Sequence, residues 1–394
     1  MVNREHYISK IRPFMGKDIV KVLTGIRRCG KSVMLELIKM DLEKRGISSR
    51  NFLSINFESM AQGYAKSIDE TYTHIQSFAK KHKKIYLFLD EIQELQDWEK
   101  LVNSCLIDFK ADIYITGSNA KMLSGELATY LAGRYVEFHI YPFSFSEAKL
   151  AGLGSFEEYA KKGGMPFLYQ NSTDWNSSKL YLSDIYSSVL LKDIVERYGV
   201  RDVDLLKRLL QFFIANIGHS FSATSVLKYL KNEKRSLSAE TIYNYIDYCK
   251  NACLLHLVHR KDISGKKMLR FQEKIYIADH GIREAVYGNN MKDIEQVLEN
   301  IVYMELLRRG YDVCVGKVDE FEIDFVASTG AKQIYIQVCY LLASKATAER
   351  EFSPLLKIRD NFPKFVISTD KFDMSREGIV HKNIEEFLLS QHPL

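Results

Sequence analysis

Short apolar runs alternate with helical patterns along the first part of the chain. The runs lie at residues 19–23, 51–57, 85–89, 112–116 and 136–140. Each run has the length of a buried strand, and segments with helical periodicity separate them. Strands that alternate with helices in this way predict a parallel sheet with helices on both faces, so we assign residues 1–142 to an α/β core.

The pattern changes after residue 142 and again after residue 203. Residues 143–203 are mostly helical, with a break at Gly163-Gly164-Met165-Pro166, and we expect a helical lid or connector there. Three helical patterns and two strand patterns then lie at 205–217, 222–230, 238–252, 254–259 and 268–277. Three helices followed by a two-stranded hairpin predict a winged-helix segment over residues 204–272.

Residues 273–394 return to a mixture of helices and strands. A helix predicted at 295–309 ends before Gly310, which is typical of a C-cap glycine. A further helix is expected to begin at Pro354. Strands are predicted at 311–315, 322–327, 334–340 and 364–368. We therefore expect a separate α/β domain at this end of the chain.

Composition narrows the class of protein. With 394 residues and 46% hydrophobic content, the chain is long enough for about two to four globular domains. A net charge of +5 permits contact with nucleic acid without demanding it. The six cysteines form no C-x-x-C pair, which predicts reduced thiols and neither a zinc site nor a disulfide framework. A charged N-terminus and the lack of a bilayer-length apolar run predict a cytoplasmic protein without membrane contact.

The first predicted strand leads directly into a phosphate-binding motif. Residues Gly25-Ile26-Arg27-Arg28-Cys29-Gly30-Lys31-Ser32 spell G-x-x-x-x-G-K-S between a strand and a helix. The glycines let the backbone turn so that consecutive N–H groups cradle phosphate oxygens. We expect Lys31 to reach the β- and γ-phosphates and the Ser32 hydroxyl to ligate Mg²⁺. Arg27 and Arg28 either contact phosphates or are solvated charges.

Hydrolysis needs a bound Mg²⁺ and an activated water, and two acids at the end of a later strand are candidates for these roles. Asp90 and Glu91 directly follow the run at 85–89. We expect Asp90 to hold Mg²⁺ through water and Glu91 to polarise the attacking water as a general base. The alternative is that both acids only begin a helix.

Two further positions are candidates for contact with the γ-phosphate. Asn119, and as second choice Ser118, follows the strand at 112–116 and can hydrogen-bond the γ-phosphate or the water, with a plain loop turn as the alternative. Arg134 can stabilise transition-state charge in its own subunit or across the interface of a homo-oligomer, and the alternative is a surface arginine. Since no guanine-reading Asn-Lys-x-Asp motif is present, ATP is the expected nucleotide.

These motifs resemble those of a large prokaryotic family. They are Thr24–Ser32, Leu89–Gln93, Thr116–Asn119, Leu131–Arg134 and Tyr141–Phe145. The chain is similar to the AAA-type predicted ATPases that carry a C-terminal domain of unknown function, close to the archaeal-type ATPases. The resemblance covers essentially the whole chain. It implies an ATP-binding AAA core, a winged-helix segment and a C-terminal domain resembling the PD-(D/E)xK nuclease fold.

The nuclease resemblance is incomplete at the residues that carry the chemistry. Such nucleases use a helix glutamate, a strand aspartate and a (D/E)-x-K on the next strand to hold Mg²⁺ and activate water. Glu299 matches the helix glutamate and Asp324 matches the strand aspartate, but Gln337 and Cys339 stand where the last acid and the lysine belong. We therefore expect the fold without its nuclease activity. The candidate residues of a vestigial site are Glu299, Glu322, Asp324 and Gln337.

Basic residues in and around the predicted winged helix permit nucleic-acid binding. The helix at 238–252 is the candidate recognition helix, although Glu240 and Asp247 would face phosphates poorly. The basic residues are Lys228, Lys231, Lys234, Arg235, Lys250, Arg260, Lys261, Lys266, Lys267 and Arg270. Winged helices also act as adaptors between proteins, so a protein partner is the alternative.

The sequence thus predicts a Mg²⁺-dependent ATPase coupled to a winged-helix and nuclease-like region, with DNA as a candidate target. Two alternatives remain open. One is a nucleotide-gated binding or scaffold protein that hydrolyses little ATP. The other is an ATP-regulated, Mg²⁺-dependent nuclease.

Overall fold

The computed structural model describes residues 2–63, 67–119, 131, 133–170, 174–232, 238–263, 265 and 267–390, with side chains for all of these except 229–232 and 267–272. The chain divides into two compact units. The first comprises Met1–Pro142 with Asn251–Cys253, and the second comprises Phe143–Lys250 with Leu254–Leu394. No helix in the described ranges is long and apolar enough to cross a membrane.

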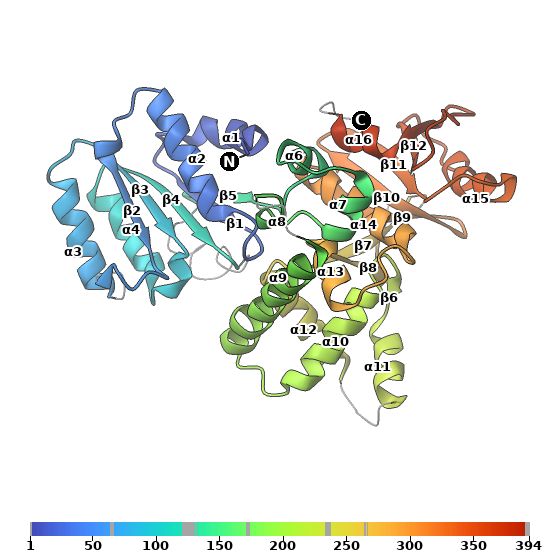
Figure 1. Cartoon of the computed structure of the whole chain (residues 1–394), viewed down its shortest axis with the longest axis horizontal. Coiled ribbons are helices and arrows are strands. Elements are labelled where there is room, and N and C mark those ends of the chain that lie inside the picture. Colours follow the sequence, from blue (N-terminus) through green and yellow to red (C-terminus); the bar gives the residue numbers. More distant parts are fainter. Residues whose placement is uncertain are drawn as a thin grey trace. The chain divides into compact units, whose positions relative to one another are not determined.

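The first unit is built on a five-stranded parallel sheet, which confirms the prediction from the alternating pattern (Figure 1). The strand order is β2-β3-β4-β1-β5. The strands are β1 (Val20–Thr24), β2 (Phe52–Asn56), β3 (Ile85–Asp90), β4 (Ala111–Gly117) and β5 (Tyr135–His139). The helices are α1 (Glu5–Ile11), α2 (Lys31–Lys44), α3 (Ile68–Ala79) and α4 (Trp98–Asp108), with 3₁₀ turns at Arg12–Phe14, Ser49–Asn51 and Ile92–Glu94.

Helices shield both faces of this sheet. Alternate strand residues face opposite sides, and Val22 and Leu87 belong to a buried cluster that includes Trp98 and other residues of α3 and α4. Helix α2 packs on the other face, where Lys39 Nζ lies 5.0 Å from the centre of the Phe88 ring. Because the strands are parallel, the carboxyl ends of β1, β3 and β4 meet at one edge of the sheet.

The second unit holds an eight-stranded mixed sheet of order β13-β12-β11-β10-β9-β7-β8-β6. Pairing is parallel at β13–β12, β12–β11 and β9–β7 and antiparallel at the other positions. The strands are β6 (Ser220–Phe221), β7 (Leu255–Asp262), β8 (Lys267–Ile277), β9 (Asp312–Val318), β10 (Phe321–Thr329), β11 (Lys332–Val338), β12 (Lys364–Ser368) and β13 (Val380–Asn383).

Helices of the second unit come in two groups along the chain. The group before β7 is α6 (Phe145–Leu150), α7 (Phe156–Lys162), α8 (Phe167–Gln170), α9 (Trp175–Ser188), a π-helical turn (Val189–Glu196), α10 (Val203–Ala215), α11 (Ala223–Asn232) and α12 (Ala239–Asn251). The group after β8 is α13 (His280–Val286), α14 (Ile294–Arg308), α15 (Lys345–Leu356) and α16 (Ile384–Leu389). The expected helices at 205–217, 222–230, 238–252 and 295–309 are therefore present as α10, α11, α12 and α14.

The two segments that the sequence pattern separates share this one sheet. Strand β7 pairs with β8 as the expected hairpin, but Arg260–Asp262 of β7 also pair in parallel with Val315–Lys317 of β9. The expected boundary between residues 272 and 273 falls inside β8. A hydrophobic pattern identifies strands but does not show which of them pair across long sequence distances, so the continuous sheet is not visible in the sequence.

The helix expected to begin at Pro354 begins nine positions earlier, so that prediction was wrong. Helix α15 starts at Lys345, and the Ser344 hydroxyl caps it by accepting the Thr347 N–H at 3.1 Å. Ser-x-x-Thr is a weaker start signal than a proline at the first turn. Pro354 instead lies in the last turn of the helix.

Candidate nucleotide-binding site

The phosphate-binding motif forms a tight loop between β1 and α2. Gly25 and Gly30 have φ of 146° and 102°, in the range that side chains disfavour. A Cβ on Gly25 would lie 2.1 Å from the Ile140 carbonyl oxygen and 3.0 Å from Cys29 Sγ. Arg28 also has a positive φ, of 69°. The loop therefore needs glycine at position 25 both for its backbone angles and for its close approach to Ile140, the residue after β5.

Lys31 lies at the start of α2 with its ammonium inside the loop. The side chain is buried, and Nζ donates to the carbonyl oxygens of Gly25 at 3.0 Å and Ile26 at 3.3 Å. Glu91 Oε1 lies 3.5 Å from the same nitrogen. These partners are neutral carbonyls and one carboxylate at the long end of ion-pair distance, so an entering phosphate oxygen can replace them.

Asp90 collects hydrogen bonds from three neighbouring elements at the carboxyl edge of the sheet. Its Oδ1 accepts from the Ser32 hydroxyl at 3.1 Å and the Thr116 hydroxyl at 2.6 Å, and its Oδ2 accepts from Asn56 Nδ2 at 3.1 Å. Burial raises the pKa of Asp90, and the hydrogen bonds from Thr116 and Ser32 oppose that rise. The carboxylate is thus held in one orientation beside the Ser32 hydroxyl.

This donor set fits Mg²⁺. Ser32 Oγ and Asp90 Oδ1 are hard oxygen ligands within 3.1 Å of each other. Among the described residues no group of three or more His, Cys, Asp and Glu side chains can hold a metal by itself. Mg²⁺ usually takes only one or two protein ligands and completes its coordination shell with water and substrate phosphates. Two protein oxygens are therefore enough for a Mg²⁺ site.

Glu91 is held in an unusual conformation next to Lys31. Its backbone is left-handed, with φ 50° and ψ 49°, and its N–H donates to the Thr116 hydroxyl at 2.9 Å. Gln93 Nε2 donates to Glu91 Oε2 at 2.6 Å. Burial alone would raise the pKa of Glu91, but the Lys31 charge and the Gln93 hydrogen bond hold it below its usual value. Strained backbone of this kind is common at functional positions.

A cavity of about 350 Å³ borders this edge of the sheet. Its walls include Ser32 and Lys39 from α2, Asn56 from β2, Asp90 from β3, and Gln62. Gln62 is tied to this wall because its Oε1 accepts the Asn56 N–H at 3.0 Å. The cavity gives solvent or a ligand access to the Asp90 carboxylate.

The structure places the remaining expected residues in different surroundings. Ser118 and Asn119 follow β4 and are buried. Arg134 is exposed, and its guanidinium donates to Asn103 Oδ1 at 2.9 Å and to the Leu131 carbonyl at 3.3 Å. Arg27 pairs with Glu58 at 3.0 Å near the surface of the loop. Arg134 is thus held against Asn103 of α4.

Three polar residues of the site were not among those expected from the sequence. Asn56 and Thr116 both stand at or next to the end of a parallel strand, so the rule that ligands meet such ends would have found them. Gln93 follows Glu91 by two positions in a 3₁₀ turn and ends the motif Leu89–Gln93, but its residue type does not predict the hydrogen bond to Glu91.

A second polar cluster lies in the second unit, where the nuclease-like residues come together around a lysine. Lys274 Nζ of β8 lies 2.7 Å from Glu299 Oε1, 2.8 Å from Glu322 Oε1 and 3.6 Å from Asp324 Oδ1. The Tyr276 hydroxyl donates to Glu299 at 2.5 Å. The sequence did not point to Lys274, because the nuclease pattern places its lysine on the strand of Gln337.

Gln337 fixes the backbone of this second cluster and does not add charge to it. Its Oε1 accepts the Asp324 N–H at 2.9 Å, and Asp324 Oδ2 accepts the Val338 N–H at 2.9 Å. Burial raises the pKa of Glu299 to about 7, with Lys274 opposing the rise. The three acids and Lys274 therefore form an ion-pair network between α14, β8 and β10, in which Lys274 and Glu299 are buried.

Three of the basic residues expected to face nucleic acid are engaged within the second unit, whereas Lys228 is exposed on α11. Arg260 pairs with Glu322, Lys261 donates to Gln333 Oε1 at 3.3 Å, and Lys250 lies 3.0 Å from Asp247. The side chains outside the described residues are those of Lys231, Lys234, Arg235, Lys266, Lys267 and Arg270.

Comparison with known proteins gives matches over nearly the whole chain. The model of an AAA domain matches residues 17–149, and the model of a domain of unknown function (DUF8612) matches residues 153–293. An uncharacterized protein of Haemophilus influenzae is 38% identical over 400 residues, which cover 99% of each protein. The uncharacterized protein MJ1544 of Methanocaldococcus jannaschii is 30% identical over 372 residues, 89% of this chain and 80% of that protein.

Among solved structures, the Walker-type ATPase PABY2304 of Pyrococcus abyssi is similar with a TM-score of 0.49 and 14% sequence identity. The match covers 72% of this chain and 95% of that chain.

Proposed function

Since the chain belongs to the same family as these Haemophilus and Methanocaldococcus proteins and carries an AAA domain, we propose that it binds Mg²⁺–ATP at the phosphate loop and hydrolyses it. One observation carries the proposal. Lys31, Ser32, Asp90 and Glu91 come from two distant parts of the sequence and lie within hydrogen-bond or ion-pair reach of one another.

Each of these residues has a distinct role. Lys31 exchanges its contacts with the Gly25 carbonyl and Glu91 for the β- and γ-phosphates. Ser32 and Asp90 hold Mg²⁺, which neutralises charge on the phosphate oxygens when it is bound. Glu91, released from Lys31, accepts the proton of the attacking water. Asn119 and Arg134 remain our candidates for γ-phosphate contact.

A nucleotide-gated switch with little hydrolysis is the second candidate, and one observation favours it. Glu91 is tied to both Lys31 and Gln93, so the base is engaged before any nucleotide arrives. If Gln93 keeps its hydrogen bond after ATP binds, the water stays unactivated and the bound state persists.

The test measures phosphate release and nucleotide affinity on the full chain. Wild type should release phosphate from Mg²⁺–ATP, and Lys31→Ala should abolish both release and tight binding. Lys44→Ala is the matched control, because Lys44 is an exposed lysine of the same helix. Tight binding with negligible release would establish the switch instead. An absence of nucleotide binding by wild type would refute both functions.

The second unit is proposed to act downstream of the nucleotide, on nucleic acid or on a protein partner. Phosphate release is compared with and without DNA at two salt concentrations, because binding through phosphate contacts weakens as salt rises. Stimulation at low salt supports a nucleic-acid partner, and no stimulation rejects it. Plasmid nicking that needs Mg²⁺ and disappears in Asp324→Ala would establish the ATP-regulated nuclease.

A further inference from the structure

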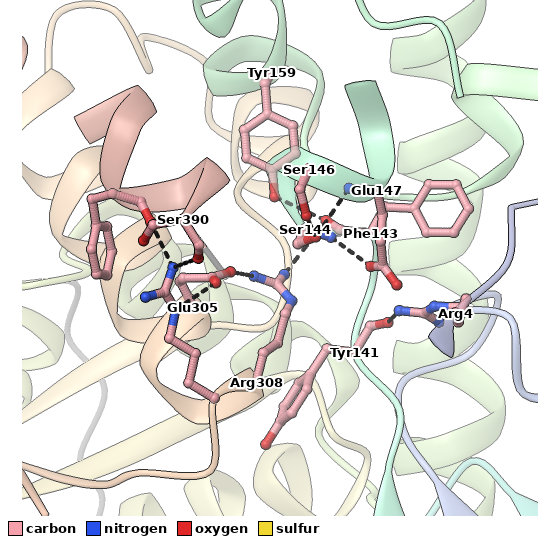
Figure 2. A network of polar contacts seen from close by, with 12 residues as sticks. Arg4, Tyr141, Phe143, Ser144, Ser146, Glu147, Tyr159, Glu305, Arg308 and Ser390 are labelled. Carbon is pink, nitrogen blue, oxygen red and sulfur yellow. Dashed lines mark hydrogen bonds and ion pairs between the residues drawn. The ribbon is translucent and has the colours of Figure 1, made fainter. Parts of the chain in front are cut away.

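Arg4 joins the phosphate loop to the segment that ends the first unit. Its side chain is only 2% exposed. Nη1 donates to the Cys29 carbonyl, inside the loop, at 3.2 Å, and Nη2 donates to the Tyr141 carbonyl at 2.8 Å. Figure 2 shows the Arg4–Tyr141 bond. The matched AAA domain begins at residue 17, so Arg4 lies outside it.

Residues 140 and 141 are fixed to the phosphate loop at further points. The Ile140 N–H donates to the Thr24 carbonyl at 2.7 Å, one residue before the loop, and the Ile140 carbonyl lies against Gly25. The Tyr141 N–H donates to the Tyr7 hydroxyl at 3.1 Å. The Arg4 guanidinium in turn lies 4.6 Å from the centre of the Tyr7 ring. A shift of the loop backbone at Cys29 therefore reaches Tyr141 through one rigid side chain.

The chain is fixed again directly after Pro142, now within the second unit. The Phe143 N–H donates to the Gly164 carbonyl at 2.7 Å, and the Phe143 carbonyl accepts from the Tyr159 hydroxyl at 2.9 Å and from Arg308 Nη2 at 3.5 Å. Figure 2 shows Tyr159 and Arg308 converging on this residue. Ser144 then caps α6 by a reciprocal pair of bonds with Glu147. Only Pro142, whose φ is fixed by its ring, separates the two anchored residues.

We propose that Arg4 is a positioning residue that couples occupancy of the phosphate loop to the anchoring of Phe143 and α6 in the second unit. The proposal rests on nucleotide binding at the loop. A planar guanidinium holds two carbonyls in fixed relative positions, whereas an ammonium is a point donor that does not enforce both. When phosphate oxygens draw the loop N–H groups inward, the Cys29 carbonyl turns with them, and Arg4 transmits that turn to the Tyr141 carbonyl.

The test is amide hydrogen exchange of the full chain with and without Mg²⁺ and a non-hydrolysable ATP analogue. In wild type the nucleotide should change the exchange of residues 143–150, which include the Phe143 amide. In Arg4→Lys the analogue should still bind, about two- to tenfold more weakly for the loss of one hydrogen bond, and the change at 143–150 should disappear. Exchange within the loop itself should still respond.

Arg12→Lys is the matched control, because Arg12 anchors the end of α1 to Asp41 and Glu5 without touching the loop. It should keep the response at 143–150. A full response in Arg4→Lys, or an equal loss in Arg12→Lys, would overturn the coupling while leaving nucleotide binding intact. If wild type binds no analogue, both proposals fall.

A second variant guards against misfolding of Arg4→Lys. Tyr7→Phe removes only the hydroxyl that accepts the Tyr141 N–H. It should retain nucleotide binding and lose part of the response at 143–150. An unchanged response in Tyr7→Phe would also contradict the coupling.

Discussion

Two of the buried lysines that face carboxylates in this protein differ in how closely those carboxylates approach the ammonium group. Lys31 of the first unit and Lys274 of the second are each 3% exposed. Lys31 has two backbone carbonyls and one carboxylate at 3.5 Å. Lys274 has two carboxylates within 2.8 Å and a third at 3.6 Å. The shortest contacts of the Lys31 ammonium are thus with neutral carbonyls, whereas those of the Lys274 ammonium are with carboxylates.

The contacts of Lys31 suit a site that accepts an anionic ligand, whereas the contacts of Lys274 suit a network of ion pairs within the fold. An anion that reaches Lys31 gains a charge-assisted hydrogen bond and competes there with two neutral carbonyls and with Glu91 at 3.5 Å. A divalent cation that approached Glu299, Glu322 and Asp324 would first have to displace a lysine that already neutralises them. The same residue types thus favour phosphate binding in one unit and structural ion pairing in the other.

The largest expected effect tests the chemistry of the first site. Glu91→Gln keeps the shape of the side chain but removes the base, so phosphate release should fall by about 10²- to 10⁴-fold while analogue binding persists. Steady-state phosphate release and equilibrium binding measure the two quantities. Lys274→Met, assayed where it is folded, is the control and should leave the rate per bound nucleotide unchanged. A Glu91→Gln variant that turns over normally would remove Glu91 from the mechanism.

The next effect tests the second cluster as a source of stability. Lys274→Met leaves the buried Glu299 and the partly buried Asp324 without this cation, which should lower the free energy of unfolding by about 3–5 kcal/mol. Denaturant unfolding followed by circular dichroism measures it. Arg208→Met is a matched control, since Arg208 pairs with Asp204 at the surface and should change stability by about 1 kcal/mol or less. Equal effects in both variants would show that the cluster is not a stabilising network.

The comparison also shows what the sequence can predict. The loop and the acids of β3 are local motifs with strand and helix in fixed order, so residues 25–32, Asp90 and Glu91 could be placed together from the sequence. The nuclease-like acids could be found too, because a family pattern marks their spacing. Their partner Lys274 could not, because it lies on a strand whose pairing with distant segments no local pattern reveals.

Arg4 and Gln93 were missed for a different reason. Each acts through a single side chain on a backbone carbonyl or a neighbouring carboxylate. Arginine and glutamine occur at many positions of the chain, so the residue type alone does not indicate which of them makes such a contact. Only the three-dimensional arrangement identifies them.

The smallest effect concerns pH and isolates one member of the second cluster. Burial raises the pKa of Glu299 from 4.5 to about 7, with Lys274 opposing the rise. Because the folded state holds this proton more tightly than the unfolded state, its contribution to stability is full below pH 4.5. That contribution is lost as the pH rises toward 7. Glu299→Gln has no such titration.

The free energy of unfolding of wild type should therefore fall relative to that of Glu299→Gln between pH 5 and pH 8. The amide also changes the contact with Lys274, but that change in stability does not depend on pH in this range. Denaturant unfolding of both proteins at four pH values in this range measures the difference. Parallel stability curves would mean that Glu299 stays charged throughout, as a permanent partner of Lys274. The matching measurement in the first unit is Glu91→Gln, where the low pKa of Glu91 predicts no difference in slope over the same range. A pH-dependent stability difference for Glu299→Gln and none for Glu91→Gln would show that the carboxylate beside Lys274 titrates in this range and that the carboxylate beside Lys31 does not.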